Sequence, residues 1–157
     1  MPKIENPLLL SLYSKVVDQV LSETNNIDEA NRRLRDIGRE VGSQIYLTTD
    51  IVDRTKDTIT TREDVSKLVE IIFRVLYDKK PTLVDMETAR GSVRVTDESC
   101  IWCQDVHLEG MAGFGYCEVF SGILESLLAF KGVEAKVFQE MCRATGADSC
   151  EWNIRLQ

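Results

Sequence analysis

The sequence has few of the residues and motifs that commonly carry catalysis. It contains one histidine, His107, and neither a Gly-x-Ser-x-Gly nucleophile motif nor a Walker-type phosphate loop. Cys103 lies four residues before His107, but no third residue is evident that would orient a catalytic Cys–His pair. The glycine-rich segment 110–115 lacks the lysine that accompanies most phosphate loops, so we interpret it as a connector. We therefore expect that the protein is not an enzyme.

Long apolar runs are also missing. No run approaches the ~20 apolar residues that a membrane-spanning helix needs. The first apolar stretch, residues 7–13, is short and follows no cationic region, so we expect no signal peptide. We expect a cytoplasmic protein without direct membrane insertion, which reaches membranes only through its partners.

Positive charge is scarce in the second half of the chain. The formal net charge is −7, and the first 80 residues carry 13 basic and 14 acidic side chains, whereas the last 77 carry 6 and 12. Binding to nucleic acid requires clustered Lys and Arg, because these side chains neutralise the phosphates. The charge distribution therefore argues against nucleic acid as a partner.

The residues that are present predict one domain over residues 1–157, with 43% hydrophobic and 29% charged side chains. Apolar residues recur at helical spacing in four stretches: 7–21, 26–45, 61–79 and 114–131. Strand-like patterns occupy five shorter stretches: 82–86, 92–96, 101–108, 133–142 and 150–156. This order predicts an α+β fold, in which a layer of about four helices packs on a mainly antiparallel sheet.

Two features of the expected helices indicate how they start and pack. Asn26 with Glu29, and Thr61 with Asp64, have the spacing of N-terminal capping pairs. Gly38 and Gly42 lie four residues apart in the second helix, although each glycine costs a helix about 1 kcal/mol relative to alanine. We interpret these glycines as a place where another backbone comes close.

The five cysteines all lie between Cys100 and Cys150, and their odd number indicates a reducing compartment. Cys100 and Cys103 have the two-residue gap of a zinc knuckle, and Cys142 and Cys150 lie across a predicted hairpin turn. Cys117 is placed to approach that hairpin. Glu140 or His107 are candidates to complete the ligand set of a structural zinc ion. A disulfide and plain buried core thiols remain open as alternatives.

Several of these segments are similar to a known family. Residues 34–42, with their paired glycines, resemble the second helix of the small TRAPP subunits, a family of Golgi tethering and exchange-factor components. The segments that resemble the third helix and its exit, the fourth helix and the following strands are 71–76, 80–82, 116–124, 132–137 and Arg155. The likeness covers nearly the whole chain.

The cysteines resemble instead a sister family with the same fold, the 4-vinyl-reductase-type domain of small-molecule sensors. Cys142 and Cys150, with Gly146 between them, are similar to its C-terminal hairpin. This resemblance implies a zinc site formed by Cys117, Cys142, Cys150 and a glutamate. Gln139 stands where the glutamate is expected, and Glu140 is one position later.

The sequence differs from part of the TRAPP family in one feature that concerns lipid. Some TRAPP subunits carry a palmitoylated cysteine just before the third helix, but residues 58–62 contain no cysteine here. We therefore expect no such modification. The mixture of TRAPP-like helices and sensor-like cysteines resembles an archaeal or other prokaryotic relative.

Two functions follow as hypotheses. The first is a non-enzymatic TRAPP-like interaction subunit, which dimerises with a second copy or a related subunit and scaffolds a membrane-trafficking or GTPase-regulating assembly, with a small GTPase or a basic protein as a further partner. The resemblance implies pairing through the first two helices, with these candidate contacts: Leu9, Tyr13, Val16, Leu34, Ile37, Gly38, Val41 and Gly42. The second is a sensor domain with structural zinc and a pocket for a small apolar ligand, lined by Phe120, Leu124, Phe138 and Trp152.

Overall fold

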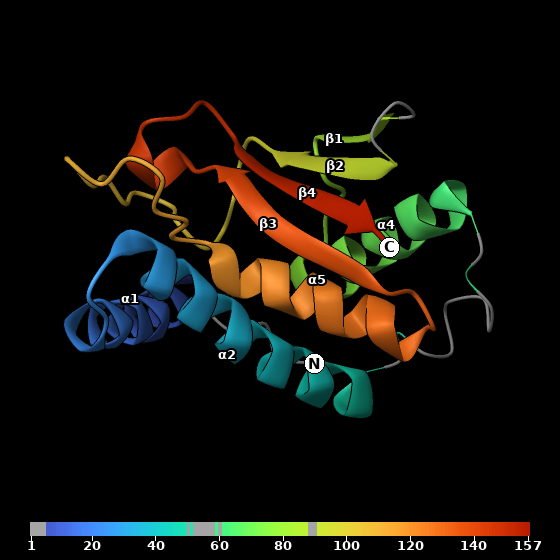
Figure 1. Cartoon of the computed structure of the whole chain (residues 1–157), viewed down its shortest axis with the longest axis horizontal. Coiled ribbons are helices and arrows are strands. Elements are labelled where there is room, and N and C mark those ends of the chain that lie inside the picture. Colours follow the sequence, from blue (N-terminus) through green and yellow to red (C-terminus); the bar gives the residue numbers. More distant parts are fainter. Residues whose placement is uncertain (1–5, 50, 52–58, 60, 88–90) are drawn as a thin grey trace.

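The computed structural model describes residues 6–49, 51, 59, 61–87 and 91–157, in which helices lie against one sheet (Figure 1). The helices of this part of the chain are α1 (Asn6–Glu23), α2 (Ile27–Thr48), α4 (Arg62–Tyr77), α5 (Glu118–Phe130) and the short 3-10 helix η2 (Arg143–Thr145). Its strands are β1 (Leu83–Glu87), β2 (Ser92–Asp97), β3 (Ala135–Met141) and β4 (Cys150–Leu156). Within these ranges, no helix is both long and apolar enough to cross a bilayer.

The sheet has the order β1-β2-β4-β3, and each neighbouring pair is antiparallel. In the middle of the sheet, Val95 of β2 lies opposite Trp152 of β4, and Val93 lies opposite Ile154. All four side chains are buried. Alternation along these strands therefore puts one apolar face against the helices, as is usual in an antiparallel sheet that is covered on one side. The predicted α+β fold is confirmed.

The helix starts follow the capping chemistry in the sequence. The Asn26 side chain accepts a hydrogen bond from the Glu29 backbone N–H at the start of α2. Thr61 and Asp64 form a complete capping box at the start of α4. These bonds satisfy backbone donors that have no partner within the helix. Both predicted helix starts are confirmed.

The most extensive helix–helix contact among the described residues joins α2 and α5, which run alongside each other (Figure 1). A methyl group added at Gly38 would overlap the Val119 carbonyl oxygen and lie 2.9 Å from the Gly122 Cα. A methyl group added at Gly122 would in turn overlap the Arg35 carbonyl oxygen. The glycines therefore permit direct backbone contact, and the prediction that another backbone comes close to Gly38 is confirmed.

Two predicted elements differ from the structure. The segment 101–108 forms turns instead of a strand, because Cys100 and Cys103 are both directed into the core. Residues three apart in a strand point to opposite faces, whereas a turn brings both to the same side. The fourth predicted helix begins at Glu118 and not at residue 114, because isolated turns, with Gly113 at φ +85°, precede it.

Candidate functional site

Four buried cysteines from three separate parts of the chain form a cluster at one end of the sheet. Cys100 and Cys103 come from the turn after β2, Cys117 directly precedes α5, and Cys150 begins β4. Their sulfur atoms all lie within 4.8 Å of one another. The Cys100 and Cys117 sulfur atoms are 3.6 Å apart, and those of Cys103 and Cys150 are 3.4 Å apart. All are free thiols, and together they could bind a metal.

Cys142, at the end of β3, is a fifth buried thiol beside this cluster. Its protonation is coupled to the thiols of Cys103, Cys117 and Cys150, but its sulfur is not among the four that lie mutually within 4.8 Å. Glu140 lies apart from the thiols: it is exposed, and its carboxylate is 4.0 Å from the Arg155 guanidinium. The strand register shifts between residues 139 and 141, so that Glu140 has no partner residue on β4.

The predicted ligand set therefore differs from the cluster that the structure assembles. Cys117 and Cys150 belong to both, whereas Cys100 and Cys103 take the places expected for Cys142 and Glu140. In the sequence, the Cys-x-x-Cys spacing was the signal that indicated Cys100 and Cys103 as metal ligands. His107, the other candidate, is exposed on the loop that follows.

Polar contacts fix the segments that carry the thiols. The Lys79 ammonium donates to both carboxylate oxygens of Asp97 at 2.8 Å and to the Ser99 carbonyl oxygen at 2.8 Å. This holds the turn from which Cys100 and Cys103 project. Around Cys117, the Gln139 side-chain oxygen accepts from the backbone N–H at 3.0 Å, and the Trp152 indole N–H donates to the carbonyl oxygen at 3.4 Å.

The protonation of the thiols is set by burial and by their mutual hydrogen bonds. Burial raises the pKa of the Cys117 thiol well above its usual value. A hydrogen bond from Cys100 lowers the pKa of the Cys103 thiol. A bound cation would favour the thiolate form of every ligand, and its binding would release protons.

A cavity of about 230 Å³ lies beside Cys142. The glycine-containing turn 112–115 forms one side, and residues 139–142 with Thr145 form the other. Cys142 is the only cysteine that lines it among the residues that the structure describes. The cavity therefore gives access from outside to one thiol of the group.

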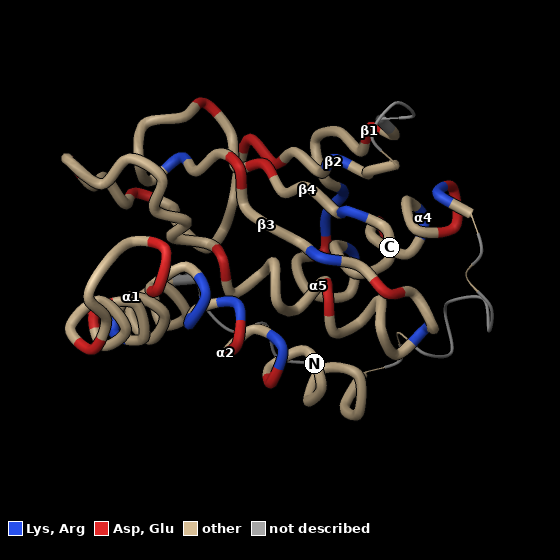
Figure 2. The backbone as a smooth tube through the Cα atoms, viewed as in Figure 1, with Lys and Arg blue, Asp and Glu red and all other residues tan. Residues whose placement is uncertain are grey.

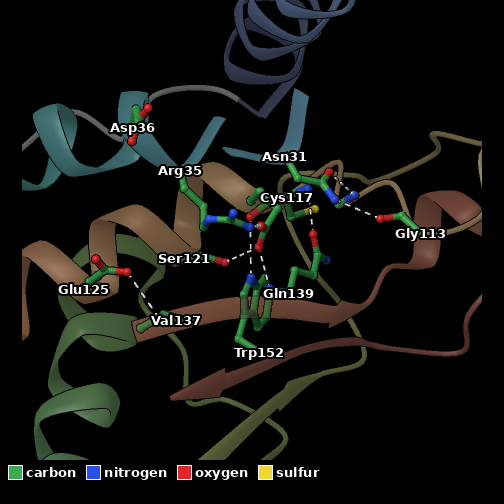
Figure 3. A network of polar contacts seen from close by, with 12 residues as sticks. Asn31, Arg35, Asp36, Gly113, Cys117, Ser121, Glu125, Val137, Gln139 and Trp152 are labelled. Carbon is green, nitrogen blue, oxygen red and sulfur yellow. Dashed lines mark hydrogen bonds and ion pairs between the residues drawn. The ribbon is translucent and has the colours of Figure 1, made fainter. Parts of the chain in front are cut away.

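A network of polar contacts beside Cys117 joins α2, α5 and β3 (Figure 3). Glu118 pairs with the Arg35 guanidinium, and it accepts a hydrogen bond from the Ser121 hydroxyl at 2.6 Å and one from the Gln139 backbone N–H. Burial raises the pKa of Glu118, and these three donors oppose the increase. Basic and acidic residues both occur along α2 (Figure 2). Further along this helix, Arg39 pairs with Glu125 of α5 at 3.0 Å. These ion pairs fix the register of the α2–α5 contact.

The residues expected at a dimer interface are divided between core and surface. Tyr13, Leu34, Gly38 and Gly42 are buried within this chain, and the two glycines face α5. Leu9 and Ile37 are half-buried. Among the candidates, the exposed ones are Val16 of α1 and Val41 of α2, whose exposed fractions are 37% and 38%. The sequence analysis did not include Leu8 and Leu12, which are exposed by 57% and 59%.

The residues expected to line a ligand pocket lie mostly in the packed core. Phe120, Leu124 and Trp152 are fully buried, and the Phe120 and Trp152 rings meet edge to face at 4.9 Å. Phe138 is half-buried, and the guanidinium groups of Arg35 and Arg155 lie over its ring at 4.9 and 5.4 Å from the ring centre. The described cavity beside the thiols lies elsewhere.

Comparison with solved structures shows the same fold in several proteins. A trafficking protein particle complex subunit 3 from Naegleria fowleri, covalently bound to palmitic acid, is 15% identical, with a TM-score of 0.85 over 97% of this chain and 95% of that one. The phenol-responsive sensory domain of the transcription activator PoxR is 15% identical, with a TM-score of 0.54 over 99% and 76% of the two chains. A vinyl-4-reductase family protein from Methanocaldococcus jannaschii is 15% identical, with a TM-score of 0.50 over 100% and 84%.

Sequence comparison identifies the family. No curated protein sequence matches this chain. The family model of the transport protein particle (TRAPP) component, however, matches residues 9–157, which is nearly the whole chain. The segments on which the resemblance depended, from the paired glycines of α2 to the last strand, lie within this range. The chain belongs to the TRAPP component family.

Proposed function

We propose that this chain is a non-enzymatic subunit of a TRAPP-type assembly in membrane trafficking, and that it acts by joining proteins together. The family match over residues 9–157 carries this proposal. The described residues support it, because the polar groups that they gather serve packing: Glu118 joins helices to the sheet, and Lys79 holds a turn. Partners are related subunits or a second copy, with a small GTPase as a further partner of the assembly.

The exposed apolar face of α1 is the proposed surface for pairing with a second copy. Leu8, Leu12 and Val16 follow one another at four-residue spacing, so they form one stripe along the helix. Their exposed fractions are 57%, 59% and 37%, and such a contiguous group of exposed large apolar side chains is typical of a protein–protein interface. Val41 and Ile37 of α2 are the remaining candidate contacts that this chain does not fully bury.

Light scattering at micromolar concentration tests the pairing, because the chain mass is 17.8 kDa and a dimer has twice this mass. We expect the wild-type chain to be dimeric and Leu12→Glu to weaken the dimer at least about tenfold, since a charge would replace a buried apolar contact. Ser11→Glu is the matched control, because it adds the same charge at an adjacent exposed position of α1. A monomeric wild type, or equal effects of both substitutions, would overturn the homodimer.

We propose that the chain reaches membranes through its partners and without a lipid of its own. The Naegleria protein carries palmitic acid covalently, but residues 58–62, just before α4, contain no cysteine in this chain. All five cysteines are buried around the candidate site. Intact-mass measurement after expression in a eukaryotic cell tests this: a mass increase by one palmitoyl group would overturn the proposal.

A second candidate function is that of a small-molecule sensor domain with a structural zinc ion. The observation that favours it is the cluster of four buried thiols, because structural zinc is commonly held by four cysteine or histidine side chains. The ligand would fit the cavity beside Cys142 better than the packed core around Phe120 and Trp152. Calorimetric titration of the zinc-loaded chain with phenol is the test, and the absence of saturable binding would remove phenol-type ligands.

A further inference from the structure

Building on the structural zinc proposed above, we infer which residues hold the ion and how it enters. The four ligands are Cys100, Cys103, Cys117 and Cys150, and Cys142 is a fifth thiol that stands at the entrance without being a ligand. This set contains no carboxylate and differs in two positions from the one that the sensor resemblance implies. The site is therefore a tetrathiolate centre.

The spacing of the sulfur atoms fits one tetrahedral ion. A zinc–sulfur bond of about 2.3 Å in tetrahedral geometry puts neighbouring sulfur atoms roughly 3.8 Å apart. The measured separations are 3.6 Å for Cys100–Cys117 and 3.4 Å for Cys103–Cys150, and no pair exceeds 4.8 Å. A disulfide, with its sulfur–sulfur bond of about 2.0 Å, is much shorter. The four side chains are thus already gathered at the distance that a shared ion requires.

The surroundings of the thiols suit negatively charged sulfur. Cys117 occupies the N-cap position of α5, where the positive end of the helix dipole favours an anion. The Arg143 backbone N–H donates to the Cys150 sulfur at 3.4 Å, an outer contact that orients a ligand. All four thiols are buried, so the negative charges of their thiolate forms would not be solvated by water and would need a cation as partner.

Two of the ligands come from a segment that has little regular structure of its own. Between β2 and α5, the chain passes through turns from residue 98 to residue 117. Cys100 and Cys103 stand in one of these turns, and Cys117 ends the segment. An ion shared with Cys150 would bind the segment to β4 at both ends. Such an ion would hold the segment 98–117 in place, and this accounts for the concentration of thiols in a part of the chain that has no helix or strand of its own.

The entrance is assigned from the cavity of about 230 Å³ beside the cluster. Among the cysteines of the described residues, Cys142 lines this cavity, and its protonation is coupled to that of Cys103, Cys117 and Cys150. Three hydrogen bonds hold its carbonyl oxygen, from the backbone N–H groups of Thr145 and Ala147 and from the Thr145 hydroxyl, each at 3.2 Å. An incoming ion therefore meets Cys142 first and is then passed to the four ligands by thiolate exchange.

The decisive experiment uses the full chain and zinc or cobalt(II) as the metal probe. Zinc per chain is counted after expression with zinc and dialysis, and X-ray absorption counts the sulfur neighbours of the bound ion. We expect one zinc with four sulfur atoms in wild type and in Cys142→Ser. We expect at least about a tenfold loss of affinity in Cys100→Ser and Cys103→Ser, because each removes one ligand. Cys142→Ser is matched to these variants, since it also replaces one buried thiol.

The uptake rate tests the role of Cys142 separately. Stopped-flow absorption of cobalt(II) by the metal-free chain should be several-fold slower in Cys142→Ser at unchanged final affinity. Equal rates would overturn the entry role. The wild-type sulfur count requires no variant, so the ligand inference can be decided even where a serine variant does not fold.

The outcomes separate this inference from the proposals on which it rests. Bound zinc with three sulfur atoms and an oxygen, or loss of zinc in Cys142→Ser with retention in Cys100→Ser, overturns the ligand set and leaves the zinc proposal standing. A chain purified without any zinc that also fails to bind added zinc overturns both. Loss of free thiols with a mass decrease of two hydrogen atoms per pair of cysteines would show disulfides in place of the metal. The dimer test is independent of all these results.

Discussion

The contact between α2 and α5 and the cysteine-bearing segment 98–117 reach order by different means. In the first, two regular helices approach so closely that Gly38 and Gly122 touch, and ion pairs such as Arg35–Glu118 fix their register. In the second, turns replace regular elements, and buried thiols together with the contacts of Lys79 hold the chain. The helical contact depends on backbone shape, whereas the segment depends on a few side chains and, in our proposal, on an ion. The two regions should therefore fail under different perturbations.

Removal of the metal should give the largest difference in stability between the two regions. A ligand present at 1,000 times its dissociation constant stabilises a folded protein by about 4 kcal/mol, so the zinc-loaded chain should lose about this much on chelation. Amide hydrogen exchange should accelerate in residues 98–117 first, while the amides of α2 and α5 stay protected. Uniform acceleration over both regions would contradict a local role of the ion.

Substitution of Gly122 by alanine should damage the helical contact instead. The added methyl group meets the Arg35 carbonyl oxygen and lies 2.7 Å from the Arg39 backbone nitrogen, and neither can move without shifting α2. We expect a loss of about 3 kcal/mol in the free energy of unfolding, measured in urea.

Gly42→Ala provides the matched control for this prediction. Its methyl group would lie 2.8 Å from the Ser126 side chain, which can shift, and 3.1 Å from the Ile123 carbonyl oxygen, a milder overlap than at Gly122, so we expect a loss of about 1 kcal/mol. Equal losses in the two variants would mean that direct backbone contact does not limit the approach of α2 and α5.

Replacement of Lys79 by methionine should loosen the segment without touching the thiols. Asp97 is buried, and it would lose the ammonium group that donates to both of its carboxylate oxygens. Leaving a buried polar group without its partner costs roughly 1–3 kcal/mol, and we expect about 2 kcal/mol by urea unfolding. Lys80→Met is the control, because Lys80 is exposed. If both variants lose the same stability, the ion pair has no special role in holding the turn.

The smallest effect concerns the pH dependence of the helical contact. Burial raises the pKa of Glu118 above the ordinary value of 4.5. A carboxyl group with a raised pKa in the folded chain binds its proton more tightly there than in the unfolded chain. Its contribution to stability is therefore fully present below pH 4.5 and is lost as the pH rises through the raised pKa.

Glu118→Gln removes this titration and so isolates it. The free energy of unfolding of wild type minus that of Glu118→Gln should decrease from pH 4.5 upward, as measured by urea unfolding at several pH values. The slope of this difference against pH is the informative quantity, because the variant also leaves Arg35 without its charged partner, which changes the absolute stability. A difference that grows with pH would mean that the donors around Glu118 outweigh its burial.

Local sequence signals predicted much of the fold because their physical causes are local. Asn26 and Thr61 cap the helices that follow them within three residues. The alternation of Val93 and Val95 predicted a strand, and the structure has one. The turn segment 101–108 was predicted wrongly as a strand, because its apolar residues imitate alternation while both cysteines point inward.

The candidate site was only half predictable for the opposite reason. Cys117 and Cys150 were expected to meet, but the sequence did not join them to Cys100 and Cys103. A thiol cluster depends on how distant segments fold back, and spacing along the chain carries no information about that. The outward position of Glu140 depends on a register shift of one residue in β3, which no local pattern indicated.

The sequence by itself therefore determined the starts of α2 and α4, the strands that form the antiparallel sheet, the close approach at Gly38 and the family. Each of these depends on neighbours within a turn of helix, on two-residue alternation or on a long pattern of small and apolar positions. Only the tertiary structure decided that Arg35 neutralises Glu118, 83 residues away, and that four thiols from three segments share one place. Such contacts arise from packing between elements, where the partner of a buried polar group is chosen by geometry and not by sequence distance.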